Sequence, residues 1–267
     1  GLAARWFGRE AAVGVGSGTD ALILGLQALG IGAGSEVIVP ALTFFATAGA
    51  VCSVGATPVI VDVDDRGLLD LDAATAALTS RTAAVIPVHL FGNRAEPAAL
   101  GVPVFDDAAQ AVGADPPCST GVLTAVSTYP TKTWGAAGEG GFIVGDAALV
   151  ERVRLLANHG AVGVHLHAQV EGAVGRNSRL DAVQAAISSG TRLPFRGEWR
   201  GVGPSPIDMT PDFPPRFGPI RATLDPLFSS TWCMSTTVFK CNRRFPRLTS
   251  RGKSIIRDLS AISPLWS

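Results

Sequence analysis

The chain has 267 residues, of which 47% are hydrophobic and 16% charged, a composition typical of a globular protein rather than a disordered one. Its longest apolar runs are far too short to cross a bilayer, and no basic segment followed by an apolar one opens it, so we expect neither a membrane protein nor a secretion signal. The four scattered cysteines form no Cys-x-x-Cys pair, which argues against a zinc or disulfide framework and favours the cytoplasm.

The net charge of zero combines two parts of opposite sign. Residues 1–189 carry 17 acidic and 10 basic side chains, a balance of −7, while residues 190–267 carry 5 and 12, a balance of +7. A basic end can mark a nucleic-acid-binding tail, but here the charge changes together with the composition and the periodicity of the sequence. After Ile187 the chain is rich in Pro, Gly and Arg without a helical or strand period. We therefore predict one domain over residues 1–187, a poorly ordered tail over 188–267, and no nucleic-acid partner.

Up to about residue 188, short β-rich runs alternate with helical ones. Strands are expected at Ala12–Val15, Glu36–Val39, Thr57–Val61, Ala83–Val88, Val102–Asp106, Ala125–Ser127 and Gly141–Val144. Helices are expected at Thr19–Leu29, Phe45–Val54, Ala73–Leu78 (capped by Asp72), Ala147–Asn158 and Arg179–Ile187. Val/Ile runs without alternation are typical of strands buried on both faces, so the pattern predicts an α/β fold with a largely parallel sheet. In such sheets ligands bind at the carboxyl ends of the strands.

A nearly solitary lysine marks the first candidate site. Only three of the 22 basic residues are lysines, and Lys132 in STYPTKTWGAAGEGG is the sole one before residue 240. A lysine in a poorly solvated pocket can act as a nucleophile and form an imine, which arginine cannot do. A surface lysine in a glycine loop is the alternative, but the avoidance of lysine elsewhere favours a chemical role.

Two further motifs precede this lysine. VFDDAAQA (residues 104–111) places a carboxylate pair at the end of a buried strand, where it could hold a metal, act as a base, meet a cationic ring nitrogen, or merely cap a helix. VGVGSGTDAL (residues 13–22) is a strand, a glycine turn and a helix start, which makes an anion cradle or a simple capped turn. It fits neither a P-loop nor a dinucleotide fingerprint. Together with Lys132, the two motifs suggest a pyridoxal phosphate site.

The order and spacing of these motifs resemble the DegT/DnrJ/StrS family of pyridoxal-phosphate-dependent sugar aminotransferases, within the aspartate-aminotransferase (fold type I) superfamily. The resemblance covers roughly residues 5–187 in unbroken order. It is carried by GSGTDALILGLQALGIGAGSEVIVPALTFFATAGAV, GATPVIVDVD, IPVHLFGN, FDDAAQA, STYPTK, GEGGFIV, NHG and GRNSRLDAVQAA. It implies a large domain with a mainly parallel seven-stranded sheet, while the family's C-terminal small domain is not recognisable in residues 188–267.

The resemblance also implies a role for each matching residue. Lys132 would form the imine with the cofactor and move the proton during transamination, and Asp107 would pair with the protonated ring nitrogen. The remaining cofactor contacts that it implies are the phosphate contacts of Gly18, Thr19 and Ser127, the ring contacts of Phe44 and Gln110, and Asn177, which would reach the phosphate of a neighbouring subunit. The last contact implies a homodimer with shared active sites. The implied reaction transfers an amino group from glutamate or glutamine to a keto sugar, usually nucleotide-linked.

The histidines carry weaker signals. His89 in VHLFGN is expected to be structural, and His159 in NHG fits a family loop without assigned chemistry. His165 and His167 could imitate a metal pair, but no third ligand converges, so we expect no metal site. Near the lysine, Trp134 replaces a usual aliphatic residue and Thr128 a usual phenylalanine, which predicts altered packing there.

Alternatives to the aminotransferase interpretation remain. Lys132 argues against the family's dehydratases, which carry histidine at that position, whereas aminocyclitol-forming and aminohydroxybenzoate-forming relatives stay open. An inactive remnant is a further alternative, because Gly1 begins inside the family pattern and the texture changes near residue 188. That change suggests a frameshift or a recombined or truncated reading frame, which translating the other two frames would test.

Overall fold

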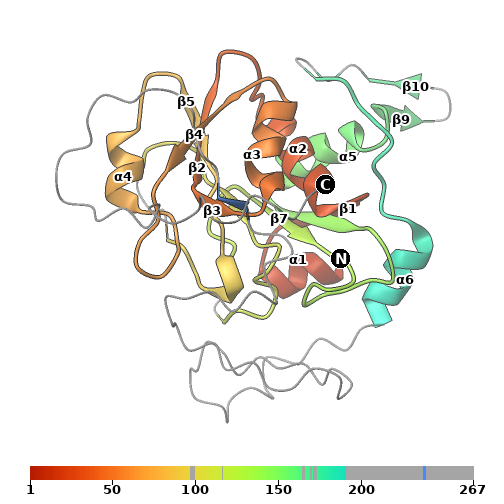
Figure 1. Ribbon diagram of the computed structural model, residues 1–267. Coiled ribbons are helices and arrows are strands. Elements are labelled where there is room, and N and C mark those ends of the chain that lie inside the picture. The colour runs from red at the N-terminus through yellow and green to blue at the C-terminus, as the bar shows by residue number, and fades with distance from the viewer. Residues whose placement is uncertain are drawn as a thin grey trace, which may run out of the picture.

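The computed structural model describes residues 1–96, 100–115, 117–163, 166–168, 170, 173–190 and 237–238. Within these residues the strands gather into a central layer with helices on both sides (Figure 1). The tail predicted over 188–267 lies outside the described residues, apart from the end of one helix and the short strand β11 (Thr237–Val238). The division into a domain and a tail therefore stays a prediction.

Seven strands form the central layer. They are β1 (Ala11–Val15), β2 (Glu36–Pro40), β4 (Thr57–Val61), β5 (Thr82–Val85), β6 (Phe105–Asp107), β7 (Leu123–Ser127) and β8 (Gly141–Gly145). One part has the order β1-β8-β7-β6 and the other β4-β2-β5, and parallel bridges from Val85 to Val104 and from Val88 to Asp107 join β5 to β6. Among these seven strands, only β8 runs antiparallel to its neighbours. The predicted α/β class with a mainly parallel seven-stranded sheet is confirmed.

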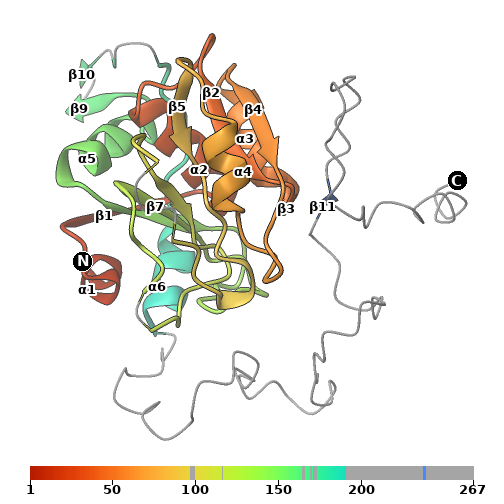
Figure 2. The ribbon, with the colours of Figure 1, turned by 90° about the vertical axis from the view of Figure 1, so that its left-hand side faces the viewer.

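Apolar side chains cover both faces of this sheet. β2, β7 and β8 are buried along their whole length, which explains their uninterrupted apolar sequences. On one face, α2 (Gly18–Ala28), α3 (Phe45–Ser53) and α5 (Ala147–Leu156) share a core with alternate residues of β1, β7 and β8. On the other face α1 (Leu2–Phe7) packs against β8, and Figures 1 and 2 place α6 (Ala182–Gly190) on the same side as α1.

Short elements connect these layers. They are β3 (Leu42–Thr43), which pairs with β11, α4 (Leu71–Ala76), the 3-10 turn η1 (Leu90–Gly92), and the paired strands β9 (Ala161–Gly163) and β10 (Leu166–His167). Because β1, β6 and β7 run parallel, their carboxyl ends meet at one edge of the sheet. α2 begins at that same edge, directly after β1. This edge therefore gathers the sequence motifs that carry the predicted chemistry.

Two helix starts differ from the sequence-based expectation. The Asp72 cap is wrong, because the Asp70 carboxylate accepts the amides of residues 72 and 73 and α4 begins at Leu71. The last helix begins at Ala182 rather than Arg179, because the Asp181 carboxylate accepts two amides of the first turn. In both cases the aspartate that caps the helix lies directly before the first helical residue.

Candidate active site

The central pair of the candidate site is Lys132 and Asp107. Asp107 is the last residue of β6, and Lys132 lies in the loop between β7 and β8, where its amide donates to the Tyr129 carbonyl at 2.8 Å. The charges of the two side chains act on each other. The structure thus brings together the lysine and the carboxylate that the sequence motifs singled out, at the carboxyl edge of the sheet.

Burial shapes the chemistry of both groups. It lowers the pKa of the half-buried Lys132 from its usual value, against the opposing pull of the Asp107 carboxylate. A lower pKa increases the fraction of neutral amine, which is the nucleophilic form. Burial raises the pKa of Asp107, while the Ala109 amide, the Thr47 hydroxyl and the charge of Lys132 oppose that shift. Asp107 is therefore a buried carboxylate whose ionised form depends on the donors around it.

Those donors are specific. The Asp107 Oδ1 atom accepts the Ala109 amide at 3.1 Å, and Oδ2 accepts the Thr47 hydroxyl at 2.9 Å. Thr47 in turn shares a hydrogen bond of 2.7 Å with the Thr43 hydroxyl. The sequence analysis missed both threonines. The signal was present in TFFAT, where two hydroxyls four residues apart share one face of the turn into α3.

The neighbouring Asp106 has a different environment, which separates the two aspartates of FDDAAQA. It is fully buried, and its carboxylate accepts the Thr120 and Gly121 amides, each at 2.7 Å, and pairs with His89 Nε2 at 3.0 Å. The other ring nitrogen of His89 accepts the Ala95 amide at 3.1 Å. Both contacts of the His89 ring are buried, in agreement with the structural role expected for His89.

The start of α2 provides an anion cradle. Ser17 caps the helix by accepting the Asp20 amide at 3.0 Å, and the first-turn residues Gly18 and Thr19 follow it directly. Amides of a first helical turn point out of the helix end and favour an anion there. Gly18 packs against the end of β7, because a Cβ on Gly18 would lie only 2.7 Å from the Ser127 Cβ. The structure thus places Gly18 in direct contact with Ser127, with Thr19 next along the helix.

The other predicted contacts lie around this edge. Phe44 is the residue before α3, and its side chain is partly exposed, at 43%. Gln110 accepts the Phe91 amide through Oε1 at 3.1 Å, which connects the FDDAAQA turn to η1. Asn177 accepts from the Arg179 guanidinium at 3.4 Å. The Gly16 amide donates to Ser178, next to Asn177, at 3.1 Å, which holds this segment beside the start of α2.

Trp134, which replaces a usual aliphatic residue, packs among aromatic side chains. Its ring meets Trp6 and Phe142 edge-on, with centroid separations of 6.2 and 5.0 Å, and its Nε1 donates to the Ser188 carbonyl at 2.8 Å. A large aromatic residue therefore connects the lysine loop to α1, β8 and α6.

Nothing in the described part of the chain forms a metal site. His165 lies outside it, His167 is exposed and contacts the His159 carbonyl at 3.1 Å, and no three His, Cys, Asp or Glu side chains among the described residues cluster suitably. His159 has a left-handed backbone with φ of 56°. No helix described here has both the length and the apolar character needed to cross a bilayer.

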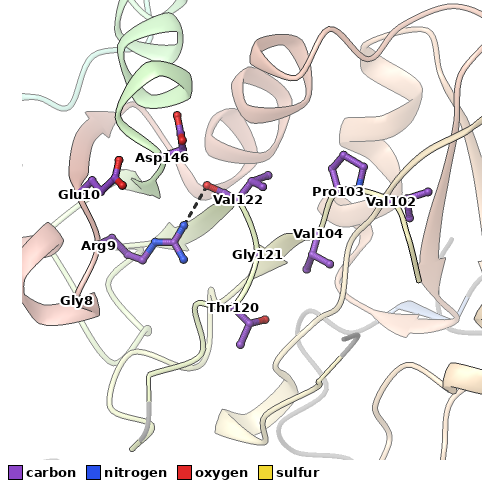
Figure 3. Close-up of a pocket in the computed structure, with 10 residues that line it drawn as sticks. All are labelled: Gly8, Arg9, Glu10, Val102, Pro103, Val104, Thr120, Gly121, Val122 and Asp146. Atoms are coloured by element: carbon purple, nitrogen blue, oxygen red, sulfur yellow. Dashed lines mark hydrogen bonds between the residues drawn. The ribbon is translucent and has the colours of Figure 1, made fainter. Parts of the chain in front are cut away.

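A hollow of about 580 Å³ lies elsewhere, at the opposite edge of the sheet (Figure 3). It is lined by residues that precede β1, β6 and β7, together with Asp146 after β8. The Arg9 guanidinium within it donates to the carbonyls of Ser119 and Val122 at 3.4 and 3.3 Å. None of the site residues predicted from the sequence lines this hollow, so it is separate from the candidate active site.

A lysine, a buried carboxylate and a helix N-terminus at the carboxyl edge of an α/β sheet are features found together in enzymes that bind a phosphorylated cofactor covalently through lysine. Comparison with known proteins gives the family: residues 2–192 match the model of the DegT/DnrJ/EryC1/StrS aminotransferase family. The chain belongs to this family.

Curated relatives support this assignment. The chain is 48% identical over 188 residues to the UDP-N-acetyl-3-dehydro-alpha-D-glucosamine 3-aminotransferase of Acidithiobacillus ferrooxidans, covering 66% of this chain and 50% of that protein. It is 44% identical over 203 residues to the dTDP-3-amino-3,4,6-trideoxy-alpha-D-glucose transaminase of Streptomyces venezuelae, covering 71% and 52%. The chain thus spans about half the length of these curated relatives.

Solved structures confirm the aspartate-aminotransferase-like fold. S. venezuelae DesV in complex with a ketimine intermediate matches with a TM-score of 0.65 and 42% identity, over 70% of this chain and 53% of that one. The Bacillus subtilis protein NtdA with bound PMP matches with a TM-score of 0.65 and 31% identity, over 70% and 45%. The PLP form of the Streptococcus pneumoniae sugar aminotransferase Spr1654 matches with a TM-score of 0.62 and 27% identity, over 70% and 55%.

Proposed function

We propose that this chain binds pyridoxal 5′-phosphate at the carboxyl edge of its sheet and serves the transamination of a keto sugar, with glutamate or glutamine as amino donor. The observation that carries the proposal is the placement of Asp107, the last residue of β6, and Lys132, in the loop after the adjacent parallel strand β7, at the same edge of the sheet. The sugar is proposed to be nucleotide-linked, because curated relatives are named for UDP-linked and dTDP-linked sugars. A curated relative named for glutamine and 2-deoxy-scyllo-inosose keeps an aminocyclitol substrate open.

The donors present fit this cofactor. Its aldehyde requires an amine whose neutral form is accessible, and burial lowers the pKa of Lys132 accordingly. Its protonated ring nitrogen requires a carboxylate, which Asp107 supplies in a buried position. Its phosphate requires a cradle of amides and hydroxyls, which we propose that Gly18 and Thr19 at the start of α2 and Ser127 at the end of β7 supply. In the proposal, Phe44 and Gln110 contact the ring.

Each residue then has a definite task. When bound, the cofactor supplies an electron sink that stabilises negative charge on the carbon bearing the amino group. Lys132 would hold the cofactor covalently through Nζ, and its amine, when free, would act as the general base that moves a proton at the carbon bearing the amino group. Asp107, held by its hydrogen-bond donors, would pair with the ring nitrogen and favour its protonated form. The buried threonines beside it exclude water from this carboxylate.

Assembly and location are part of the same proposal. Asn177 is proposed to contact the cofactor phosphate of a second copy of the chain, so that a homodimer shares its active sites. Location in the cytoplasm is proposed because Cys52 and Cys118 are free thiols in the structure, which a reducing compartment preserves.

An absorbance titration with pyridoxal phosphate tests the proposal. We expect a new band near the boundary of the visible and ultraviolet ranges in the full chain, absent from Lys132→Ala and retained in the matched control Lys253→Ala. Addition of glutamate or glutamine should then convert the band to that of the pyridoxamine form. If well-folded protein gives no band, or if the band does not change on addition of either glutamate or glutamine, the chain is an inactive remnant and the proposal fails.

A further inference from the structure

The two buried threonines of TFFAT form a hydrogen-bonded chain that ends on Asp107. Thr43, Thr47 and Asp107 are all buried, with exposed fractions of 0%, 0% and 6%. The Thr47 hydroxyl donates to Asp107 Oδ2 at 2.9 Å, and the two threonine oxygens lie 2.7 Å apart. When the Asp107 carboxylate is ionised, Thr47 directs its one hydroxyl proton to it, and the proton between the two threonines then comes from Thr43. The chain of donors therefore runs in one direction, from Thr43 to Thr47 to Asp107.

This use of a helical hydroxyl differs from the usual one. Ser and Thr in helices commonly donate to the carbonyl four residues earlier. Ser53 does so to Gly49 and Thr75 to Leu71, both at 2.7 Å. Thr47 instead donates to a side chain 60 residues away in the sequence, on a different element. Its hydroxyl is therefore committed to Asp107 rather than to its own helix.

We propose that Thr47, held by Thr43, is a positioning residue that fixes the Asp107 carboxylate in its ionised form and in one orientation. With Oδ2 bound to Thr47 and Oδ1 to the Ala109 amide, rotation of the carboxylate would break two hydrogen bonds at once. Donors to both oxygens stabilise the ionised form over the protonated one. The same turn carries Phe44, whose carbonyl accepts the Thr47 amide at 3.1 Å, so a single rigid segment sets both the ring-stacking residue and the carboxylate.

The effect of Thr47 on Asp107 can be separated from the effects of the titratable groups nearby. Lys132 acts on Asp107 through its charge. Asp106 is occupied by His89 and by backbone amides. Thr47 is a neutral side chain, so replacing it removes a hydrogen bond to the Asp107 carboxylate without changing any charge near that carboxylate. The inference about Asp107 stands on the structure alone, and its consequence for the cofactor rests on the proposed function.

The test follows the carboxyl carbon of Asp107 by NMR across pH, in the full chain labelled with ¹³C-carboxyl aspartate, with the signal assigned by its loss in Asp107→Asn. Thr47→Val keeps the shape of the side chain and removes the donor. We expect it to raise the Asp107 midpoint by about one pKa unit, a tenfold change, because a hydrogen bond to a charged group contributes about that much. Thr47→Ser should restore the wild-type midpoint, and Thr43→Val should give a smaller rise.

The matched control is Thr124→Val. Thr124 is equally buried, but its hydroxyl contacts Ser119 and the neighbouring carboxylate of Asp106. The inference is overturned if Thr47→Val leaves the Asp107 midpoint unchanged, or if Thr124→Val raises it equally. Should Thr47→Val not fold, Thr43→Val and Thr47→Ser decide the question by the same readout.

A second arm measures the dissociation constant of pyridoxal phosphate for the same variants. We expect about tenfold weaker binding in Thr47→Val and wild-type binding in Thr47→Ser and Thr124→Val. If the wild-type chain binds no pyridoxal phosphate while the Asp107 midpoint shifts as expected, the proposed function fails and the positioning role stands. If it binds the cofactor but the midpoint does not shift, the positioning role fails alone.

Discussion

Replacing Gly18 by alanine tests how closely α2 approaches β7 at the proposed phosphate cradle. The added Cβ would lie 2.7 Å from the Ser127 Cβ, 3.1 Å from its Oγ and 3.2 Å from its Cα. A change of side-chain rotamer cannot relieve the contacts with Cβ and Cα, so the backbone of α2 or β7 must shift. Overpacking of this kind costs about 1–3 kcal/mol, and the better helix propensity of alanine offsets at most about 1 kcal/mol. We expect a net loss of about 1–2 kcal/mol.

Urea unfolding followed by circular dichroism measures this loss, with two comparison variants. Gly25→Ala in the same helix would place a Cβ 2.2 Å from the Phe105 ring, away from the cradle, so it should destabilise the fold without weakening phosphate binding by the folded protein. Adding Ser127→Gly to Gly18→Ala removes the contacted Cβ and should recover most of the lost stability. The reasoning is refuted if Gly18→Ala unfolds at the same or higher urea concentration as the wild type, or if Ser127→Gly deepens its defect.

Three further predictions concern stability. Trp134→Phe should cost about 1 kcal/mol in urea unfolding, because it removes the Nε1 hydrogen bond to the carbonyl near the end of α6, and a wild-type midpoint would contradict this. Asp106→Asn should cost about 3 kcal/mol or more, because it breaks a buried pair with His89, and a loss below about 1 kcal/mol would show that this network is dispensable. Hydrogen bonds from Thr79 and Arg81 lower the pKa of Glu36 in the folded protein. The ionised Glu36 therefore stabilises the fold at pH values above the usual pKa of a glutamate, and this stabilisation is lost as the pH falls through the lowered pKa of the folded state. Glu36→Gln should flatten that part of the acid unfolding curve, and an unchanged curve would remove the basis for this expectation.

The sequence was sufficient to predict the sheet, because strands buried on both faces carry uninterrupted apolar runs such as EVIVP of β2. Helix positions were predicted to within a few residues, with errors of two and three residues at the starts of α4 and α6. Asp70 and Asp72 both precede the apolar stripe of α4, and sequence alone does not decide which carboxylate reaches the free amides. At α6 the helical period extends back beyond Asp181, whose side chain caps the first turn.

Within the candidate site, sequence motifs indicated the residues, and the tertiary fold supplied their neighbours. FDDAAQA suggested a carboxylate at a strand end, and the structure shows that Asp106 faces His89 while Asp107 faces Thr47. Adjacent residues of a strand point to opposite sides, so the two aspartates meet different partners. Thr47 was missed because its partner lies 60 residues away, a relation that local periodicity cannot contain.

The measurement that tests the central claim most directly identifies the lysine that binds the cofactor. The full chain is incubated with pyridoxal phosphate, reduced with borohydride to make the bond permanent, digested, and analysed by mass spectrometry. We predict that the phosphopyridoxyl group is attached to Lys132 and that Asp107→Asn diminishes its attachment. Attachment to Lys240 or Lys253 in its place, or no attachment in folded protein, would contradict the assignment of the active site.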